Sequence, residues 1–210
     1  HRDDAQHMFT LGMMDLPDKA KVEQLYWEIS QGVVAHFKGQ SYVPEEIRLL
    51  EDSLGDQYLC NFSVFQSLLD HWALGQLFPI MPITRLDERP SQEATLVDIT
   101  CDSDGQVNKF IDLHDVKDTL PLHPLKSNGD GTMEPYHIGF FMMGAYQDIM
   151  GDLHNLFGRV NELHVFLDPD EPAGYYVEEI LEGSTIVQAL GSVQYDENEL
   201  KRRMKAQVDE

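Results

Sequence analysis

The stretch TLVDITCDSDG, from Thr95 to Gly105, begins with the pattern of a β-strand and ends with the residues of a turn. β-branched residues occupy alternate positions in its first half, which is typical of a strand with one buried face. Aspartate, serine and glycine follow Cys101, and these residues favour a turn. We therefore predict a strand from Ala94 to Cys101, with Cys101 and Asp102 at its end, on the surface or at a subunit boundary.

The chain before this strand is expected to be mostly helical. Apolar residues recur every three or four positions from Pro17 to Gly39, and a second run of this kind extends from Pro44 to Gly55. A shorter helical piece is expected between Phe62 and Trp72. The prolines between Phe78 and Glu93 indicate an extended, irregular connector that leads into the strand.

The chain after this strand is expected to form further strands separated by turns. Gln106 to Asp112 is a candidate hairpin partner, and the apolar run from His137 to Met143 suits a buried strand. Alternating residues predict two more strands, around 163–167 and 175–181, on either side of a turn. Before them, apolar spacing predicts one helix at about 146–157.

These elements together predict an α+β protein in three parts. Residues 1–93 would form a helical region and connector, residues 94–183 a β domain with one inserted helix, and residues 184–210 a helical tail. In the tail, Asp196 followed by Glu199 has the pattern of a capping box.

The composition is strongly acidic, with 37 acidic residues against 15 basic ones and a formal net charge of −22. This charge repels nucleic acid and anionic membranes and favours cationic ligands, so we expect neither nucleic acid nor a membrane as a partner. No apolar run is long enough to cross a membrane. Only two cysteines are present, so we expect no disulfide framework and a cytoplasmic protein, with the periplasm or cell envelope as the alternative.

Cys101 lies in an acidic part of the sequence, within three residues of Asp98, Asp102 and Asp104. Nearby negative charge disfavours a thiolate, so we expect a thiol that keeps its proton and can donate it. The alternative is a small strand residue that only packs in the core. A calcium loop is excluded because Ile111 stands where the bidentate glutamate of an EF-hand belongs.

A second candidate site lies in GFFMMGAYQD, Gly139 to Asp148, where a strand is expected to pass into a helix. Backbone amides at such a corner can bind an anion such as phosphate, and Tyr146 adds a hydroxyl group. The alternative is a tightly packed corner without a ligand.

Three segments together resemble a known family, the pyridoxal-phosphate-dependent biosynthetic arginine decarboxylases of bacteria and plants. The segments are YLCNFSVFQSLLDHW (58–72), LVDITCDSDG (96–105) and GFFMMGAYQDIMGDLHNLFG (139–158). The resemblance extends from about Val22 to Gln194. It implies the alanine-racemase fold, in which a (β/α) barrel, absent here, accompanies a barrel-like or sandwich-like β domain with helical additions.

The resemblance also implies roles for individual residues. Cys101 matches the cysteine that, from a partner subunit, returns a proton to the α-carbon of the substrate. Asp102 matches a carboxylate that reaches the distal end of the basic substrate, and Tyr146 matches a tyrosine that contacts the cofactor phosphate. Asp70 lies where the family has a short specificity helix whose acid faces the substrate's cationic tail, although Leu69 replaces the usual proline.

The implied reaction converts L-arginine to agmatine and carbon dioxide in polyamine biosynthesis. It implies a homo-oligomer, a dimer or tetramer, with composite active sites, and Mg²⁺ as a second cofactor by resemblance only. None of the eight lysines lies in a segment that resembles the family's cofactor-anchoring lysine, which belongs to the N-terminal barrel. We therefore expect the C-terminal portion of such an enzyme, inactive alone. The alternatives are a decarboxylase of another basic amino acid and a non-catalytic homologue that regulates a decarboxylase partner.

Overall fold

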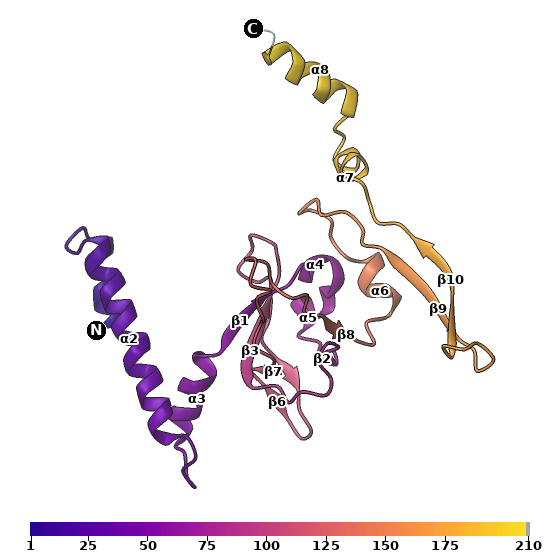
Figure 1. Ribbon diagram of the computed structural model, residues 1–210. Coiled ribbons are helices and arrows are strands. Elements are labelled where there is room, and N and C mark those ends of the chain that lie inside the picture. The colour runs from indigo at the N-terminus through magenta and orange to yellow at the C-terminus, as the bar shows by residue number, and fades with distance from the viewer. Residues whose placement is uncertain (209–210) are drawn as a thin grey trace. The chain divides into compact units, whose positions relative to one another are not determined.

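The computed structural model describes residues 1–208 (Figure 1). The chain forms two compact units, His1–Ile149 and Met150–Glu210. The division predicted from the sequence, after residues 93 and 183, stays a prediction about the organisation of the chain.

The N-terminal unit begins with helices α1 (Arg2–Thr10), α2 (Leu16–Phe37) and α3 (Glu45–Ser53). The carboxylate of Asp15 accepts a hydrogen bond from the Asp18 N–H at 2.9 Å, so α2 has an N-cap. Both predicted long helices are confirmed. Helix α1 lies in a stretch for which no element is predicted from the sequence, and Arg2 connects it to α2 through an ion pair with Glu23 at 2.9 Å.

The main sheet of this unit consists of β1 (Asp56–Leu59), β3 (Gln92–Val97), β4 (Gln106–Val107) and β7 (Leu120–Leu122). Strand β3 pairs in parallel with β1 and antiparallel with β4 and β7. The hairpin partner predicted after residue 105 is therefore confirmed for its first two residues. Strand β1 lies before residue 93, whereas β4 and β7 lie after it. The sheet therefore contains residues from both sides of the predicted boundary at residue 93.

The predicted strand from Ala94 to Cys101 is confirmed only as far as Val97. The Asp98 N–H still donates to the Gly105 carbonyl at 2.8 Å, but the buried Asp98 carboxylate accepts hydrogen bonds from the backbone N–H groups of Val64 and Thr100, both also at 2.8 Å. Such local side-chain bonds compete with a strand ladder. The strand therefore ends before the turn residues that were expected to end it.

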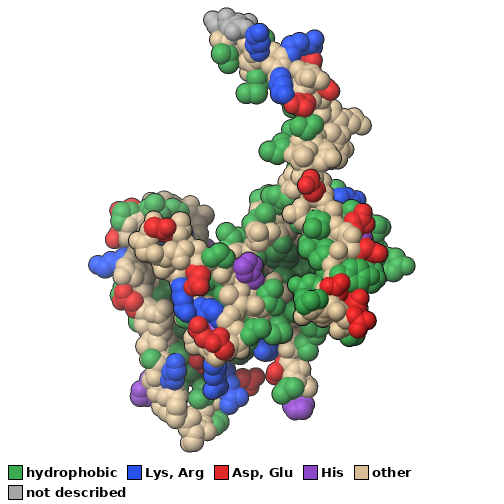
Figure 2. All heavy atoms as spheres, turned by 45° about the vertical axis from the view of Figure 1, so that its right-hand side comes forward, with side chains coloured by type: hydrophobic (Ala, Val, Ile, Leu, Met, Phe, Trp, Pro, Cys, Tyr) green, Lys and Arg blue, Asp and Glu red, His purple; other side chains and the backbone are tan. Residues whose placement is uncertain are grey.

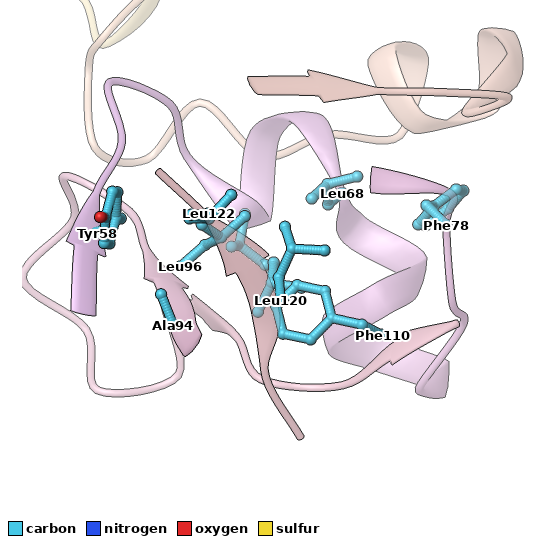
Figure 3. Close-up of a cluster of buried hydrophobic side chains, with 10 residues drawn as sticks. Tyr58, Leu68, Phe78, Ala94, Leu96, Phe110, Leu120 and Leu122 are labelled. Carbon is cyan, nitrogen blue, oxygen red and sulfur yellow. The ribbon is translucent and has the colours of Figure 1, made fainter. Parts of the chain in front are cut away.

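The core of the unit lies between this sheet and two short helices, α4 (Val64–Ser67) and α5 (Leu69–Leu74). Leu96 and Leu122 on the sheet and Leu68 between the helices are at most 1% exposed. Figure 3 shows these side chains clustered with Phe110 and Leu120. The single helical piece predicted over 62–72 is thus two helices that meet at the buried residue Leu68.

Two small antiparallel pairs complete the unit: β2 (Ile80–Pro82) with β8 (Ile138–Phe140), and β5 (Phe110–Ile111) with β6 (Val116–Lys117). The residues of β8 are partly exposed, so the prediction of a buried strand over 137–143 is wrong about burial. The α+β class is confirmed. Within residues 1–208 the sheets are small and none closes into a barrel, and the alanine-racemase type of β domain stays a prediction.

Helix α6 (Gly144–Ile149) lies earlier than the helix predicted at about 146–157, so that prediction is wrong about position. Met142 and Gly144 have positive φ angles, 62° and 65°, which separate α6 from β8. Beyond Ile149 the apolar side chains at helical spacing are largely exposed, for example Met150 at 58% and Phe157 at 46%. Without a buried face, apolar spacing alone does not stabilise a helix.

The C-terminal unit contains a hairpin of β9 (Glu162–Leu167) and β10 (Tyr175–Leu181), followed by α7 (Ile186–Ser192) and α8 (Glu197–Val208). Both predicted strands and the helical tail are confirmed. The Asp196 carboxylate accepts the Glu199 N–H at 2.8 Å, as the capping pattern predicts. Helix α8, uppermost in Figure 2, begins with acidic residues and continues with basic ones, and Glu199 forms ion pairs with Arg202 and Arg203. Among residues 1–208, no helix is both long and apolar enough to cross a membrane.

Candidate functional site around helix α5

Helix α5 carries Asp70 and has no side-chain cap of its own. Its N-cap residue is Leu68, whose φ of −134° and ψ of 43° separate α5 from α4. At its other end, Gly75 adopts the left-handed conformation, with φ 67°, that commonly closes a helix. Leu68 fixes this short helix to the core because its side chain is 1% exposed.

Asp70 is held by a residue distant in sequence, Gln147 of α6. The Asp70 backbone N–H donates to Gln147 Oε1 at 3.0 Å, and Gln147 Nε2 donates to Asp70 Oδ2 at 2.6 Å. Gln147 is 5% exposed, whereas its neighbour Tyr146 is 75% exposed. The two bonds bring the predicted substrate-binding acid close to the segment that carries the predicted phosphate-binding tyrosine, and α5 and α6 lie side by side in Figure 1.

The segment with Cys101 and Asp102 forms a hydrogen-bonded turn on the surface. Asp102 Oδ1 accepts the Asp104 N–H at 2.9 Å, and the Asp102 carbonyl accepts the Gly105 N–H at 3.1 Å. A Cβ on Gly105 would lie 2.2 Å from Asp98 Oδ1, so only glycine fits there. Cys101 is exposed, which confirms the predicted surface position and contradicts packing of its thiol in the core of this chain.

Trp72 connects this turn to α5. Its indole Nε1 donates to Asp104 Oδ2 at 3.2 Å, two residues after Asp102. Helix α5 therefore contacts both α6 and the turn that follows β3. The structure brings all three segments with predicted site residues, around Asp70, Cys101 and Tyr146, to one short helix of the N-terminal unit. Sequence reasoning missed the role of the two residues that connect them, because Trp72 counted only as an apolar residue of the predicted helix and Gln147 belongs to no motif.

The two cysteines differ in their chemistry. Burial raises the pKa of the Cys60 thiol to about 11, and Cys60 Sγ is 3.5 Å from the Tyr58 carbonyl oxygen. A thiol with a raised pKa stays protonated and is a poor nucleophile near neutral pH. Cys101 is therefore the cysteine with access to a ligand.

Within residues 1–208, no group of three or more His, Cys, Asp or Glu side chains is arranged to bind a metal ion. The predicted Mg²⁺ thus stays an implication of the resemblance alone. Several lysines are used in ion pairs, for example Lys126 with Glu88 at 3.1 Å.

Known proteins resemble this chain along its whole length. A family model described as the arginine decarboxylase helical bundle domain matches residues 1–51. Biosynthetic arginine decarboxylase 1 of Synechocystis sp. is 48% identical over 206 residues, which cover 96% of this chain and 29% of the relative. Biosynthetic arginine decarboxylase of Gloeobacter violaceus is 44% identical over 211 residues, which cover 100% of this chain and 32% of the relative.

A solved structure is also similar to this chain along its whole length. The biosynthetic arginine decarboxylase SpeA of Campylobacter jejuni matches with a TM-score of 0.71 and 34% identity, covering 100% of this chain and 31% of that chain. This chain therefore spans about a third of the length of the proteins it resembles. The match lies in the C-terminal part of the larger relatives.

Proposed function

We propose that this chain is the C-terminal portion of a biosynthetic arginine decarboxylase, which converts L-arginine to agmatine and carbon dioxide. The observation that carries the proposal is the similarity along almost the entire chain, at 48% and 44% identity, to two proteins of that name. The link between the Asp70 segment and the segment of Tyr146, made by Gln147, supports it, because these two segments would belong to the same site.

The proposed substrate suits the charge of the site. Asp70 and Asp102 would bind the guanidinium group of arginine, a planar cation that donates paired hydrogen bonds to carboxylates. The formal net charge of −22 attracts a cationic substrate over longer distances. Acids that bind the far end of the side chain also select its length, so shorter or differently shaped basic amino acids should bind less well.

The proposal includes pyridoxal phosphate as the cofactor. This chain offers a hydrogen-bond donor that fits the phosphate group of this cofactor. Tyr146 is exposed at the first turn of α6, so its hydroxyl can donate a hydrogen bond to a phosphate oxygen. No lysine occurs between Lys126 and Lys201, so the segment around Tyr146 offers no amine for the cofactor aldehyde. The covalent anchor would lie outside this chain, in the expected N-terminal barrel.

Cys101 would supply the proton that completes the reaction. When bound, pyridoxal phosphate accepts the electron pair released as carbon dioxide leaves. The Cys101 S–H bond then breaks and a C–H bond forms at the α-carbon that lost its carboxylate. Water returns a proton to the sulfur. The exposure of Cys101 in this chain fits a donor that acts across a subunit boundary, and a homo-oligomer with shared sites is part of the proposal.

The experiment that tests this function measures carbon dioxide release by the full-length protein, with pyridoxal phosphate, from L-arginine, L-lysine and L-ornithine. We expect L-arginine to be the preferred substrate by kcat/KM. Equal or greater turnover of lysine or ornithine would favour a decarboxylase of another basic amino acid. No release from any of the three would favour a non-catalytic homologue.

A further inference from the structure

Helix α5 starts in a way that its own sequence cannot stabilise. The first N–H groups of a helix need acceptors, which the side chain of the N-cap residue usually provides. Leu68 occupies that position and has no oxygen or nitrogen in its side chain. The Asp70 N–H instead donates to Gln147 Oε1 at 3.0 Å, so a side chain 77 residues away acts as the cap.

The second half of the same amide determines where the Asp70 carboxylate lies. Because Gln147 Oε1 accepts the backbone N–H, its Nε2 must point toward Asp70, and it donates to Oδ2 at 2.6 Å. A carboxylate only accepts hydrogen bonds, so this orientation of the amide is the one that satisfies both groups. Gln147 is 5% exposed, and water therefore cannot readily replace it.

We propose that Gln147 is the positioning residue for Asp70 and thereby sets selectivity for the cationic end of the substrate. The inference rests on the proposed function, in which Asp70 binds the guanidinium group. Gln147 fixes one carboxylate oxygen and the backbone beneath it, and it leaves the other oxygen, Oδ1, for the substrate. Since Tyr146 is the adjacent residue of α6, the same helix determines the positions of the two groups that would bind opposite ends of the bound substrate and cofactor.

The test uses the full-length enzyme with Gln147→Met, which keeps the size of the side chain and removes both hydrogen bonds. We expect the KM for L-arginine to rise about tenfold or more, because a hydrogen bond to a charged group is lost, with kcat changed about twofold at most. The preference for L-arginine over L-lysine should fall. Hydrogen exchange of the backbone over 64–74 should become faster.

Gln147→Glu provides a second variant that keeps the acceptor for the Asp70 N–H but places a second carboxylate against Asp70. We expect a KM for L-arginine at least as high as that of Gln147→Met, because two carboxylates repel each other at this distance. Gln188→Met is the matched control. Gln188 Oε1 accepts the Thr185 N–H at 2.8 Å in the capping box of α7, so the same kind of bond is lost without contact to Asp70, and the KM should stay unchanged.

Asp70→Asn separates this inference from the proposed function. If Asp70→Asn raises the KM and Gln147→Met does not, Gln147 is not the positioning residue, while the proposed function stands. If Asp70→Asn leaves the KM unchanged, the proposed role of Asp70 fails, and this inference fails with it. If both raise the KM, the double variant should show little further increase over Asp70→Asn, because Gln147 acts through Asp70. A fully additive increase would overturn the inference.

Discussion

Strands β3 and β10 have similar local patterns but very different surroundings. In β3 the alternate residues Ala94 and Leu96 are 0% exposed, whereas every residue of β10 is exposed. Strand β3 is central in a four-stranded sheet, and β10 has β9 as its only neighbour among the described residues. Alternation in sequence is therefore enough to predict a strand, but not to predict what covers its apolar face.

The difference shows where the chain has a core of its own. The N-terminal unit buries a contiguous apolar cluster and connects its site segments to it through Leu68. In the C-terminal unit, large apolar side chains such as Leu163, Val165 and Ile180 are at least half exposed. A two-stranded hairpin by itself is marginally stable in water, and apolar surface of this kind is typical of an interface.

The largest expected effect is on chemistry in the N-terminal unit. In the full-length enzyme, Cys101→Ala should lower kcat by about 10²–10⁴-fold, the range typical of a positioned proton donor. Cofactor binding should be nearly unchanged, and an aldehyde side product should appear because the proton reaches the wrong carbon. Cys101→Ser should behave similarly, since a hydroxyl holds its proton more tightly than a thiol. Turnover and aldehyde are measured on the same folded sample.

Cys60→Ala is the control for that variant. It removes the other thiol, which is partly buried and has a raised pKa, so it should leave kcat nearly unchanged. Unchanged turnover in Cys101→Ala, without aldehyde, would show that Cys101 has no part in proton transfer.

The next largest effect is on stability. It is seen when a leucine is replaced by alanine in the N-terminal unit and, for comparison, in the C-terminal unit. In the 210-residue chain, Leu96→Ala should reduce the free energy of unfolding by about 2–5 kcal/mol, because it leaves a cavity beside Val107 and Leu122. Leu163→Ala, at a position 57% exposed, should cost about 0.5 kcal/mol or less. Denaturant titration followed by circular dichroism measures both.

Repeating Leu163→Ala in the full-length protein sharpens the comparison. If the rest of the protein covers the hairpin, the cost there should rise toward that of a buried leucine. Equal, large costs for both variants in the 210-residue chain would contradict the contrast between the two regions.

The smallest effect concerns the reactivity of the two thiols. At pH 8, with a pKa of about 11, about one Cys60 thiol in a thousand is ionised, and the side chain is partly buried. Alkylation of Cys60 should therefore be much slower than that of exposed Cys101, and its rate should rise about tenfold per pH unit up to pH 10. Mass spectrometry of the labelled peptides measures both rates. Faster labelling of Cys60 than of Cys101 would contradict the burial of Cys60.

These differences also explain how far the sequence predicts the structure. Helix α2 and strand β10 are predicted well because their signals are local, apolar residues every three or four positions in one case and alternation in the other. The end of β3 was missed because Asp98 bonds to Val64, 34 residues away. The helix at about 146–157 was misplaced because apolar spacing does not reveal whether a partner buries it.

The candidate site shows the same limit. Cys101, Asp102, Asp70 and Tyr146 were selected from the sequence through motifs, and their roles stay predictions. Gln147 could not be selected, because its importance comes from an uncapped helix 77 residues earlier in the chain. A glutamine has no motif of its own, and only its buried position between α5 and α6 gives it a role.

The most direct test of the account is complementation between the two parts of the enzyme. The 210-residue chain, the remaining N-terminal part and both together are incubated with pyridoxal phosphate and L-arginine, and carbon dioxide release is measured. We predict no release from either part alone and release when both are combined, because none of the eight lysines of this chain lies in a segment that resembles the family's cofactor-anchoring lysine. Robust release by the 210-residue chain alone would contradict the account.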